Sequence, residues 1–303
     1  MVAPAGPFDP AAFEAGLAVL ERRLGLVPRM RSDVSARRGY LAGDDGRRAE
    51  EWREAVADRE ARAIFCARGG YGAMRILRAV DPARLAEAPK LVVGFSDITA
   101  IHAALNRGGL ATVHGPVVTQ LGRAPEDALR HLEALLFEEP AHPGPWGVPA
   151  PGAGLVAERT VRAGRAAGPL LGGTLTLLAH LAGTPYAPRL EGAILLLEDV
   201  GERPYRIDRC LTQLRLAGAL SGVAGVALGR FTGCDDGGLL ALDVVREAIL
   251  ALGVPAVEGL PVGHDDANFA APLGAVATLV APGPGEEGPA RLLFDGWTAR
   301  AIG

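Results

Sequence analysis

Short apolar runs alternate with helical patterns through the first 120 or so residues, and this alternation constrains the fold more than any other feature. Residues 61–67 (ARAIFCA) and 90–95 (KLVVGF) have the apolar content of buried strands. Each is followed by helical spacing, over residues 72–80 and 97–108, and residues 110–117 predict a further strand. Strands that alternate with helices of this size are typical of βαβ units and a parallel sheet. We therefore expect an α/β fold that begins with a parallel-sheet domain.

A stretch rich in proline and glycine divides the chain. Residues 140–154 (PAHPGPWGVPAPGAG) contain five prolines and four glycines, a composition typical of a connection and not of a core element. We predict an N-terminal domain over residues 1–140, a linker over 141–155 and a C-terminal domain over 156–303.

The predicted C-terminal domain combines strands and helices. Residues 192–200 and 222–231 are apolar runs suited to buried strands. Between them, residues 204–218 carry apolar side chains on one helical face, with a proline near the start and a glycine at the end. This pattern predicts a mixed β/α domain.

Composition excludes several classes of function. The 303 residues are 49% hydrophobic and 22% charged, with a net charge of −4, and no basic run indicates nucleic-acid binding. The longest apolar tract, residues 168–187, contains adjacent glycines, a histidine and a proline, which argues against a membrane span. The first ten residues lack the pattern of a secretory signal. We expect a cytoplasmic protein that binds neither nucleic acid nor membrane and uses no cofactor.

Ser96 lies where the strand over 90–95 passes into a helix. A serine there can cap the helix, with Asp97 favourable to the helix dipole. A sharp strand-to-helix turn can also expose a serine hydroxyl as a nucleophile. The segment GFSDI lacks the second glycine of the GxSxG pattern, so both interpretations stay open.

A nucleophilic serine needs a base. Lys90, the only lysine, begins the strand that ends at Ser96, and six residues at ~3.3 Å each place it about 20 Å away. His114 and His264 lie near predicted strand ends and are the candidate bases. The other histidines fall in helical segments or in the linker and are expected to be structural: His102, His131, His142 and His180.

The acid that orients such a base is expected after a buried strand. Glu198 and Asp199 follow four aliphatic residues, and because side chains alternate along a strand, only one of the two faces the site. His264, Asp265 and Asp266 could instead indicate a metal site. Adjacent residues rarely converge on one ion, so we predict no metal.

Two glycines, Gly69 and Gly70, lie between a predicted strand and the next helix. Glycines there leave backbone N–H groups free to bind a phosphate or an oxyanion. Neither GxGxxG nor GxxxxGK[ST] is present, so nucleotide binding is the weaker interpretation.

Several stretches together, in order along most of the chain, resemble the LD-carboxypeptidases, which are cytoplasmic serine peptidases. They are ARGGYGAMRIL, GFSDITAIHAAL, HGPV, GGTLTLLAHLAGTPY, LLLEDVGERPYRIDRCLTQLRLAG, GVALGRF and PVGHDDANFAAPLG. The resemblance implies a Ser–Glu–His triad of Ser96, Glu198 and His264. It also implies an oxyanion hole from the backbone N–H groups of Gly70, or alternatively Gly69, and of Asp97.

The resemblance further implies an N-terminal flavodoxin-like α/β domain and a C-terminal mixed β/α domain, with the active site between the two domains. It also implies a homodimer. The substrate implied is a murein tetrapeptide or UDP-MurNAc-tetrapeptide, which loses its terminal D-Ala. Arg68 and Arg230 are candidates to bind the terminal carboxylate. A second activity of the same superfamily, cleavage of acyl-sulfamoyl or phosphoramidate adenylates by microcin C immunity peptidases, is the alternative. One departure is at the start, where the family has a full strand and only Met1 and Val2 precede APAGP, so the first strand is expected to be truncated or to begin upstream.

Overall fold

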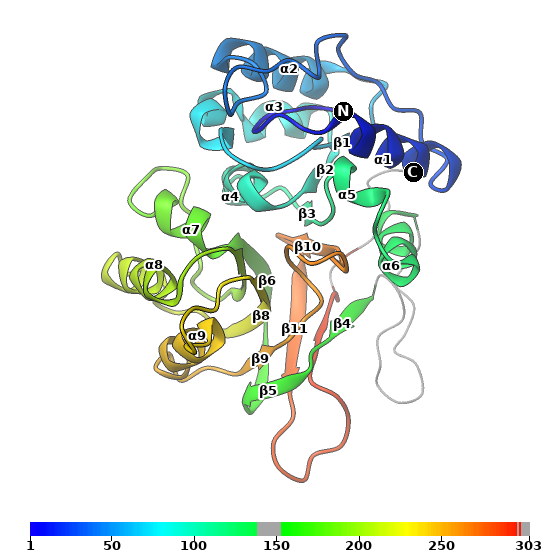
Figure 1. Cartoon of the computed structure of the whole chain (residues 1–303). Coiled ribbons are helices and arrows are strands. Elements are labelled where there is room, and N and C mark those ends of the chain that lie inside the picture. The colour runs from blue at the N-terminus through cyan, green and yellow to red at the C-terminus, as the bar shows by residue number, and fades with distance from the viewer. Residues whose placement is uncertain (138–152, 296, 298–303) are drawn as a thin grey trace.

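The computed structural model describes residues 1–137, 153–295 and 297. Two sheets lie one beyond the other, with the N-terminal half of the chain around the first and most of the C-terminal half around the second (Figure 1). The predicted α/β fold class is confirmed. Most of the predicted linker falls outside the described residues.

The first sheet has the strand order β1-β2-β3-β10. The first three strands are parallel, as the alternating pattern predicts, and they are β1 (Ala63–Phe65), β2 (Leu91–Gly94) and β3 (Thr112–His114). Strand β10 (Ala271–Leu273) comes from the predicted C-terminal domain and pairs antiparallel with β3. The first sheet is therefore completed by a late segment of the chain.

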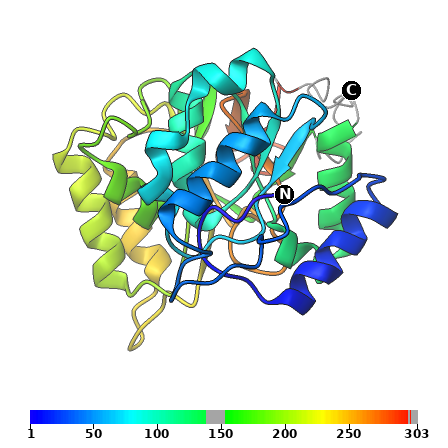
Figure 2. The ribbon, with the colours of Figure 1, turned by 90° about the horizontal axis from the view of Figure 1, so that it is seen from above.

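Helices enclose this sheet. Asp9 caps α1 and Asp44 caps α2, each through a side-chain oxygen that accepts a backbone N–H of the first turn. Seen from above, α2 crosses the sheet while α1 and α6 lie at one side (Figure 2). The elements are α1 (Pro10–Arg22), α2 (Asp45–Ala57), η1 (Ala73–Ala79), α3 (Pro82–Glu87), η2 (Ser96–Ile98), α4 (Thr99–Arg107), α5 (Val118–Leu121) and α6 (Glu126–Phe137). The predicted helix over residues 72–80 is the 3₁₀ helix η1, and α3 was not predicted.

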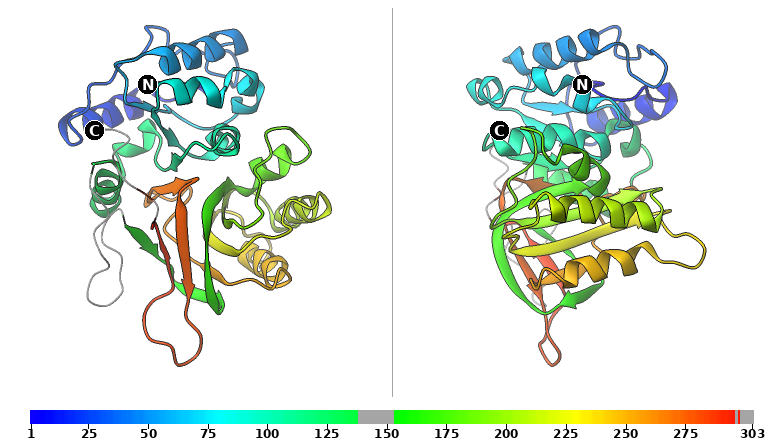
Figure 3. Two further views of the ribbon diagram at one scale, coloured as in Figure 1. Left: turned by 180° about the vertical axis from the view of Figure 1, so that it is seen from behind. Right: turned by 90° about the vertical axis from the view of Figure 1, so that its left-hand side faces the viewer.

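The second sheet has the order β4-β12-β11-β6-β7-β8-β9-β5 and mixes parallel with antiparallel pairs. Three helices, α7, α8 and α9, stack on one of its faces (Figure 3). The strands are β4 (Gly154–Val156), β5 (Arg159–Arg162), β6 (Gly164–Thr174), β7 (Ile194–Val200), β8 (Gly225–Thr232), β9 (Ala256–Glu258), β11 (Val276–Ala281) and β12 (Arg291–Leu293). The helices are α7 (Leu175–Leu181), α8 (Pro204–Leu216) and α9 (Ala241–Leu250). No helix in the described part of the chain is long and apolar enough to cross a membrane.

The two halves share one apolar core. A continuous cluster of buried side chains extends from Val93 and Val113 in the first sheet, through Leu273 of β10, to Leu196 and Leu279 in the second. Burial of these side chains in common holds the two sheets in a defined relation, because separating the halves would expose the shared cluster to water.

Shortening one side chain of β10, the strand that joins the C-terminal half to the first sheet, tests this arrangement. We expect Leu273→Ala to lower the free energy of unfolding by about 2–4 kcal/mol, because Leu273 is fully buried and the truncation leaves a cavity between the halves. Urea denaturation measures the change. Leu239→Ala, at an exposed leucine, is the control, with an expected change within about 0.5 kcal/mol. Equal stability of the two variants would contradict the structural role of β10.

Candidate active site

Ser96 follows β2 in a strained backbone conformation. Its φ of 64° makes it the only non-glycine residue of the described chain with positive φ. Non-glycine residues in this region cost of order 1 kcal/mol or more and occur where the surrounding structure enforces them. The Oγ atom makes no capping hydrogen bond to η2 or α4 and instead lies 3.0 Å from His264 Nε2. The helix-cap interpretation of Ser96 is therefore wrong, and the hydroxyl is presented to the site.

His264 lies in a loop after β9 that buried hydrogen bonds hold in place. The N–H of Gly263 donates to Asn268 Oδ1 at 3.0 Å, and Asn268 Nδ2 donates to Gln120 Oε1 at 3.3 Å. Asn268 and Gln120 are both buried, and Gln120 belongs to α5 of the N-terminal half. The loop that carries the imidazole is thus attached to the half of the molecule that carries Ser96.

Glu198 lies within β7 and is fully buried. Its Oε2 is 2.7 Å from His264 Nδ1, and its Oε1 accepts a hydrogen bond from Thr174 Oγ1 at the end of β6. Asp199 points to the other face of β7, where Thr176 and the Val200 N–H donate to it. The alternation of side chains leaves Glu198 as the acid beside His264.

The three side chains form a chain of hydrogen bonds, from Ser96 Oγ to His264 to Glu198. A hydroxyl bonded to one imidazole nitrogen, with a carboxylate bonded to the other, is the arrangement that activates serine nucleophiles. The Phe95 ring packs on His264 with a centroid separation of 4.7 Å and restricts the rotation of the imidazole.

Glu198 and His264 shift each other's pKa through their opposite charges and their hydrogen bond. Burial opposes ionisation of Glu198, but its hydrogen bond with His264 and the positive charge there outweigh burial and lower its pKa. Burial lowers the pKa of His264, but the hydrogen bond and charge of Glu198 more than compensate and raise that pKa above its ordinary 6.5. The site therefore favours an imidazolium beside a carboxylate, which is the state that general-base catalysis produces.

The predicted glycine loop lies against Ser96. A Cβ atom at Gly69 would lie 2.8 Å from Ser96 Cβ and 3.0 Å from its Oγ, so no side chain fits at this position. The next residue, Gly70, has a φ of 102°, which glycine adopts readily.

Asp97 connects this loop to the serine turn. Its Oδ2 accepts the N–H of Ala73 at 2.7 Å, so the carboxylate caps η1 and not the helix that follows Ser96. Burial raises the pKa of Asp97. The backbones of Gly70 and Asp97 thus lie on two segments that are held together beside Ser96 Oγ.

His114 lies close to this site without belonging to the chain of hydrogen bonds. It is fully buried, its ring meets Phe95 edge-on at 5.8 Å, and neither ring nitrogen has a hydrogen-bond partner among the described residues. Burial lowers its pKa to about 4, so it is neutral at pH 7. His114 is therefore not the imidazole that contacts Ser96.

Two other histidines are structural, as expected. His102 bonds the carbonyl of Gly94 at 2.7 Å, and His131 bonds that of Ala270 at 2.9 Å. His142 lies outside the described residues. Within those residues, no group of three or more His, Cys, Asp and Glu side chains could hold a metal ion.

The two candidate arginines differ in how they are paired. Arg230 lies 2.7 Å from Glu158 and 3.9 Å from Asp265, so acids already neutralise its charge. Arg68 is exposed and donates from Nη1 to the carbonyl of Pro7 at 2.5 Å. It forms no ion pair within the part of the chain that the structure describes, so its charge stays available to an anionic ligand.

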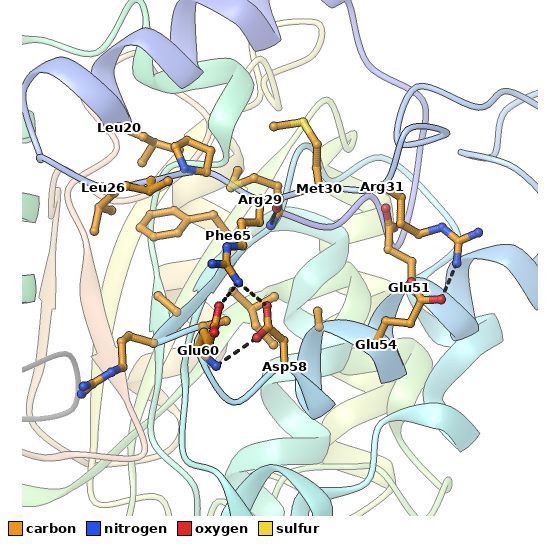
Figure 4. Close-up of a pocket in the computed structure, with 18 residues that line it drawn as sticks. Leu20, Leu26, Arg29, Met30, Arg31, Glu51, Glu54, Asp58, Glu60 and Phe65 are labelled. Carbon is orange, nitrogen blue, oxygen red and sulfur yellow. Dashed lines mark hydrogen bonds and ion pairs between the residues drawn. The ribbon is translucent and has the colours of Figure 1, made fainter.

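A cavity of about 550 Å³ lies elsewhere, beside strand β1 (Figure 4). Its lining includes Leu20, Leu26 and Phe65, and its charged groups are paired, with Arg31 bonded to Glu54 at 2.8 Å. None of the predicted site residues lines it. Geometry at Ser96, and not cavity size, therefore identifies the candidate site.

Sequence reasoning did not identify Phe95, Thr174, Gln120 and Asn268 as supporting residues. Phe95, Thr174 and Asn268 lie within the stretches GFSDITAIHAAL, GGTLTLLAHLAGTPY and PVGHDDANFAAPLG, but their contacts depend on segments distant in sequence. Gln120 has no recognisable signal, because a glutamine at an element boundary is common in any chain.

Comparisons with known proteins agree with this geometry. Residues 1–115 match the model of the LD-carboxypeptidase N-terminal domain, and residues 167–279 match that of the LD-carboxypeptidase C-terminal domain. The chain is 42% identical to a putative carboxypeptidase of Streptomyces coelicolor, over 92% of this chain and 89% of the relative. It is 37% identical to the murein tetrapeptide carboxypeptidase of Pseudomonas aeruginosa, over 92% of each chain.

A solved structure gives the same result. The crystal structure of muramoyltetrapeptide carboxypeptidase from Oxalobacter formigenes superimposes with a TM-score of 0.82 and 29% identity, over 97% of this chain and 98% of that one. The fold and site thus define a two-domain serine-type peptidase. The chain belongs to the LD-carboxypeptidase family, and the predicted resemblance is confirmed.

Substitution of the glycine beside the serine tests the geometry of the site. We expect Gly69→Ala to reduce kcat/KM at least ~100-fold with little loss of stability, because the added methyl displaces the Ser96 side chain. Steady-state kinetics on a cleaved peptide and thermal unfolding measure the two effects. Gly283→Ala is the control, since the atom nearest to a Cβ there is Ala163 Cβ at 3.5 Å and the φ of Gly283 is not positive. Full activity of Gly69→Ala would refute this placement of Ser96.

Proposed function

We propose that this protein is a serine LD-carboxypeptidase that removes the terminal D-Ala from murein tetrapeptides. The observation that carries the proposal is the hydrogen-bond chain from Ser96 through His264 to Glu198, in a member of the LD-carboxypeptidase family. The relative from Pseudomonas aeruginosa is named a murein tetrapeptide carboxypeptidase, which supports this substrate class.

In the proposed first step, Ser96 Oγ attacks the carbonyl carbon of the third stem residue. His264 Nε2 accepts the hydroxyl proton, and Glu198 stabilises the imidazolium that forms. The N–H groups of Gly70 and Asp97 donate to the oxyanion. A general base of this kind typically contributes 10²–10⁴-fold to the rate, and one oxyanion donor about 10²–10³-fold.

The second half of the reaction reverses the proton transfers. His264 gives its proton to the nitrogen of D-Ala as the C–N bond breaks, which leaves the tripeptide esterified to Ser96. Water then attacks the ester, His264 accepts a proton from that water, and the tripeptide leaves with a free carboxylate. Ser96 recovers its proton from His264, so the enzyme is regenerated.

A carboxypeptidase must also recognise the terminal carboxylate of its substrate. Arg68 is the better of the two candidates, because its guanidinium lies beside Gly70 and has no acidic partner among the described residues. Glu158 and Asp265 compete for Arg230, so a carboxylate would have to displace at least one of them. We assign the carboxylate contact to Arg68.

Release of D-Ala tests the function directly. We expect the purified protein to release D-Ala from a murein tetrapeptide, or from UDP-MurNAc-tetrapeptide, and Ser96→Ala to lose at least roughly 1,000-fold in kcat/KM. Mass spectrometry of the tripeptide product measures both. Equal release by wild type and Ser96→Ala would exclude Ser96 as nucleophile.

A processed-microcin analogue, an acyl-sulfamoyl adenylate, serves as the competing substrate in the same assay. Cleavage of the analogue with no release of D-Ala would replace the proposed function by the alternative expected from the sequence resemblance. Cleavage of neither compound by a folded protein would refute both.

The pH dependence of kcat/KM tests the pairing of His264 with Glu198. His264 acts as a base only when neutral, and its pKa is raised above 6.5, so activity is expected to fall as pH drops through a value above 6.5. Glu198→Gln removes the charge that raises this pKa while burial continues to lower it. The acidic limb is then expected to move to lower pH as kcat falls.

Asp243→Asn, at an exposed acid on α9 paired with Arg246, is the matched control and is expected to keep the wild-type profile. If the acidic limb of the kcat/KM profile stays at the same pH in Glu198→Gln, a group other than His264 controls it.

A further inference from the structure

Two exposed aromatic side chains lie side by side near the candidate site. Tyr40 is 65% exposed and Tyr71 is 51% exposed, and their rings meet edge-on with centroids 5.5 Å apart. The chain has four tyrosines in all. Two of them on the surface in mutual contact, from loops about 30 positions apart, form a patch that the triad does not use.

Tyr71 belongs to the loop that contacts the nucleophile. A Cβ at Gly69 would lie 3.0 Å from Ser96 Oγ, and consecutive Cα atoms are separated by about 3.8 Å. The Cα atom of Tyr71, two residues on, therefore lies within roughly 12 Å of Ser96 Oγ. Tyr71 thus belongs to a loop that borders the site where the peptide carbonyl would be attacked.

The backbone on both sides of Tyr71 is fixed. Gly70 and Gly72 have φ values of 102° and 130°, and the carbonyl of Gly72 accepts a hydrogen bond from Arg48 Nη1 at 2.7 Å. The same Arg48 nitrogen donates to the carbonyl of Pro4 at 2.6 Å, and Arg48 is fully buried. An exposed ring on a rigid support loses little entropy when a ligand packs against it.

Tyr40 is presented by an equally defined turn. Reciprocal backbone hydrogen bonds of 2.9 and 3.1 Å between Arg38 and Leu41 close the turn at its tip. Leu41 is buried, and the N–H of Ala42 donates to the carbonyl of Ala5 at 2.9 Å. The backbone of Tyr40 is therefore fixed by the turn and by the buried residues that follow it, while its ring stays exposed.

A planar ion pair lies beside the two rings. Arg75 donates from Nε and Nη2 to the carboxylate of Asp45 at 2.8 to 3.0 Å, and both groups are partly exposed. Those hydrogen bonds raise the pKa of Arg75, with smaller contributions from the nearby Tyr71 and Tyr40. Aromatic faces flanked by fixed polar groups suit a ligand with apolar C–H faces and peripheral hydroxyl or amide groups, which describes a sugar ring.

We propose that Tyr40 and Tyr71 form the subsite for the N-acetylmuramoyl sugar of the substrate, and that they make the enzyme select sugar-bearing over sugar-free tetrapeptides. This inference rests on the proposed function. The structural relative from Oxalobacter formigenes is named a muramoyltetrapeptide carboxypeptidase, a name that specifies a sugar on the peptide.

The length of the substrate agrees with this assignment. Three residues separate the scissile carbonyl from the sugar, and three extended residues span roughly 10 Å. That distance is similar to the bound on the separation of Ser96 Oγ from the Tyr71 backbone. A tetrapeptide held at Ser96 is thus long enough for its sugar to reach the two rings.

The test compares two substrates that differ only in the sugar. For each variant, the ratio of kcat/KM on N-acetylmuramoyl-tetrapeptide to kcat/KM on the sugar-free tetrapeptide is measured. We expect Tyr40→Ala and Tyr71→Ala each to lower this ratio by roughly fivefold to tenfold, and Tyr40→Phe to retain it because the ring face is kept. Tyr205→Ala is the control, since Tyr205 is 52% exposed on α8 and lies in neither loop.

Calorimetric binding to Ser96→Ala separates this proposal from the proposed function, because binding requires no turnover. In Ser96→Ala, the ratio of the affinity for the sugar-bearing peptide to that for the sugar-free peptide is expected to fall when Tyr40→Ala is added. A protein that releases no D-Ala but shows this change in affinity retains the subsite and loses the proposed function. A ratio that stays unchanged in Tyr40→Ala, or absence of binding by the sugar-bearing peptide, overturns the subsite.

Discussion

The site depends on how one buried carboxylate is compensated. Glu198 is inaccessible to solvent, and a carboxylate in that environment is stable only when hydrogen bonds and an opposite charge replace its hydration. Thr174 satisfies one oxygen and His264 the other. Because the compensation comes from the His264 imidazole itself, the interaction that makes burial of Glu198 tolerable also orients His264 toward Ser96.

That orientation requires the two halves of the molecule to act as one body. Ser96 belongs to the first half, whereas Glu198 and His264 belong to the second. The shared apolar cluster, the pairing of β10 with β3 and the bond from Asn268 to Gln120 all cross the boundary. A shift of 1 Å between the halves would break the 3.0 Å contact of Ser96 with His264, so rigidity here would serve the proposed chemistry as well as stability.

The sequence predicts local elements well and long-range contacts poorly. The periodicities around β1, β2, β7, β8 and α8 indicate their type and approximate bounds, because those patterns reflect burial in each element separately. The membership of β10 in the first sheet, and the supporting role of Asn268, depend on pairings across more than 100 positions that no local pattern encodes. Residue patterns alone left Glu198 and Asp199 equivalent, as they did His114 and His264. The family resemblance chose between them, and the geometry places the chosen residues together.

The pairing of β7 with β8 is irregular next to Glu198. Along β7 and β8 the pairing shifts between Leu197 and Asp199, so that β8 carries one extra residue opposite Glu198. This bulge coincides with Gly229, where a Cβ would lie 2.4 Å from the carbonyl of Val262. Bulges of this kind redirect side chains beside active sites.

The residues around the bulge also form hydrogen bonds with the segment that leads to His264. The N–H of Arg230 donates to the carbonyl of Val262 at 2.8 Å, and the N–H of Leu260 donates to the carbonyl of Leu228 at 3.0 Å. The segment that leads to His264 is therefore hydrogen-bonded to the irregular part of β8. A Cβ at Gly229 would also lie 3.2 Å from Glu198 Cβ, so the irregular part of β8 borders both the buried acid and the segment that leads to the loop histidine.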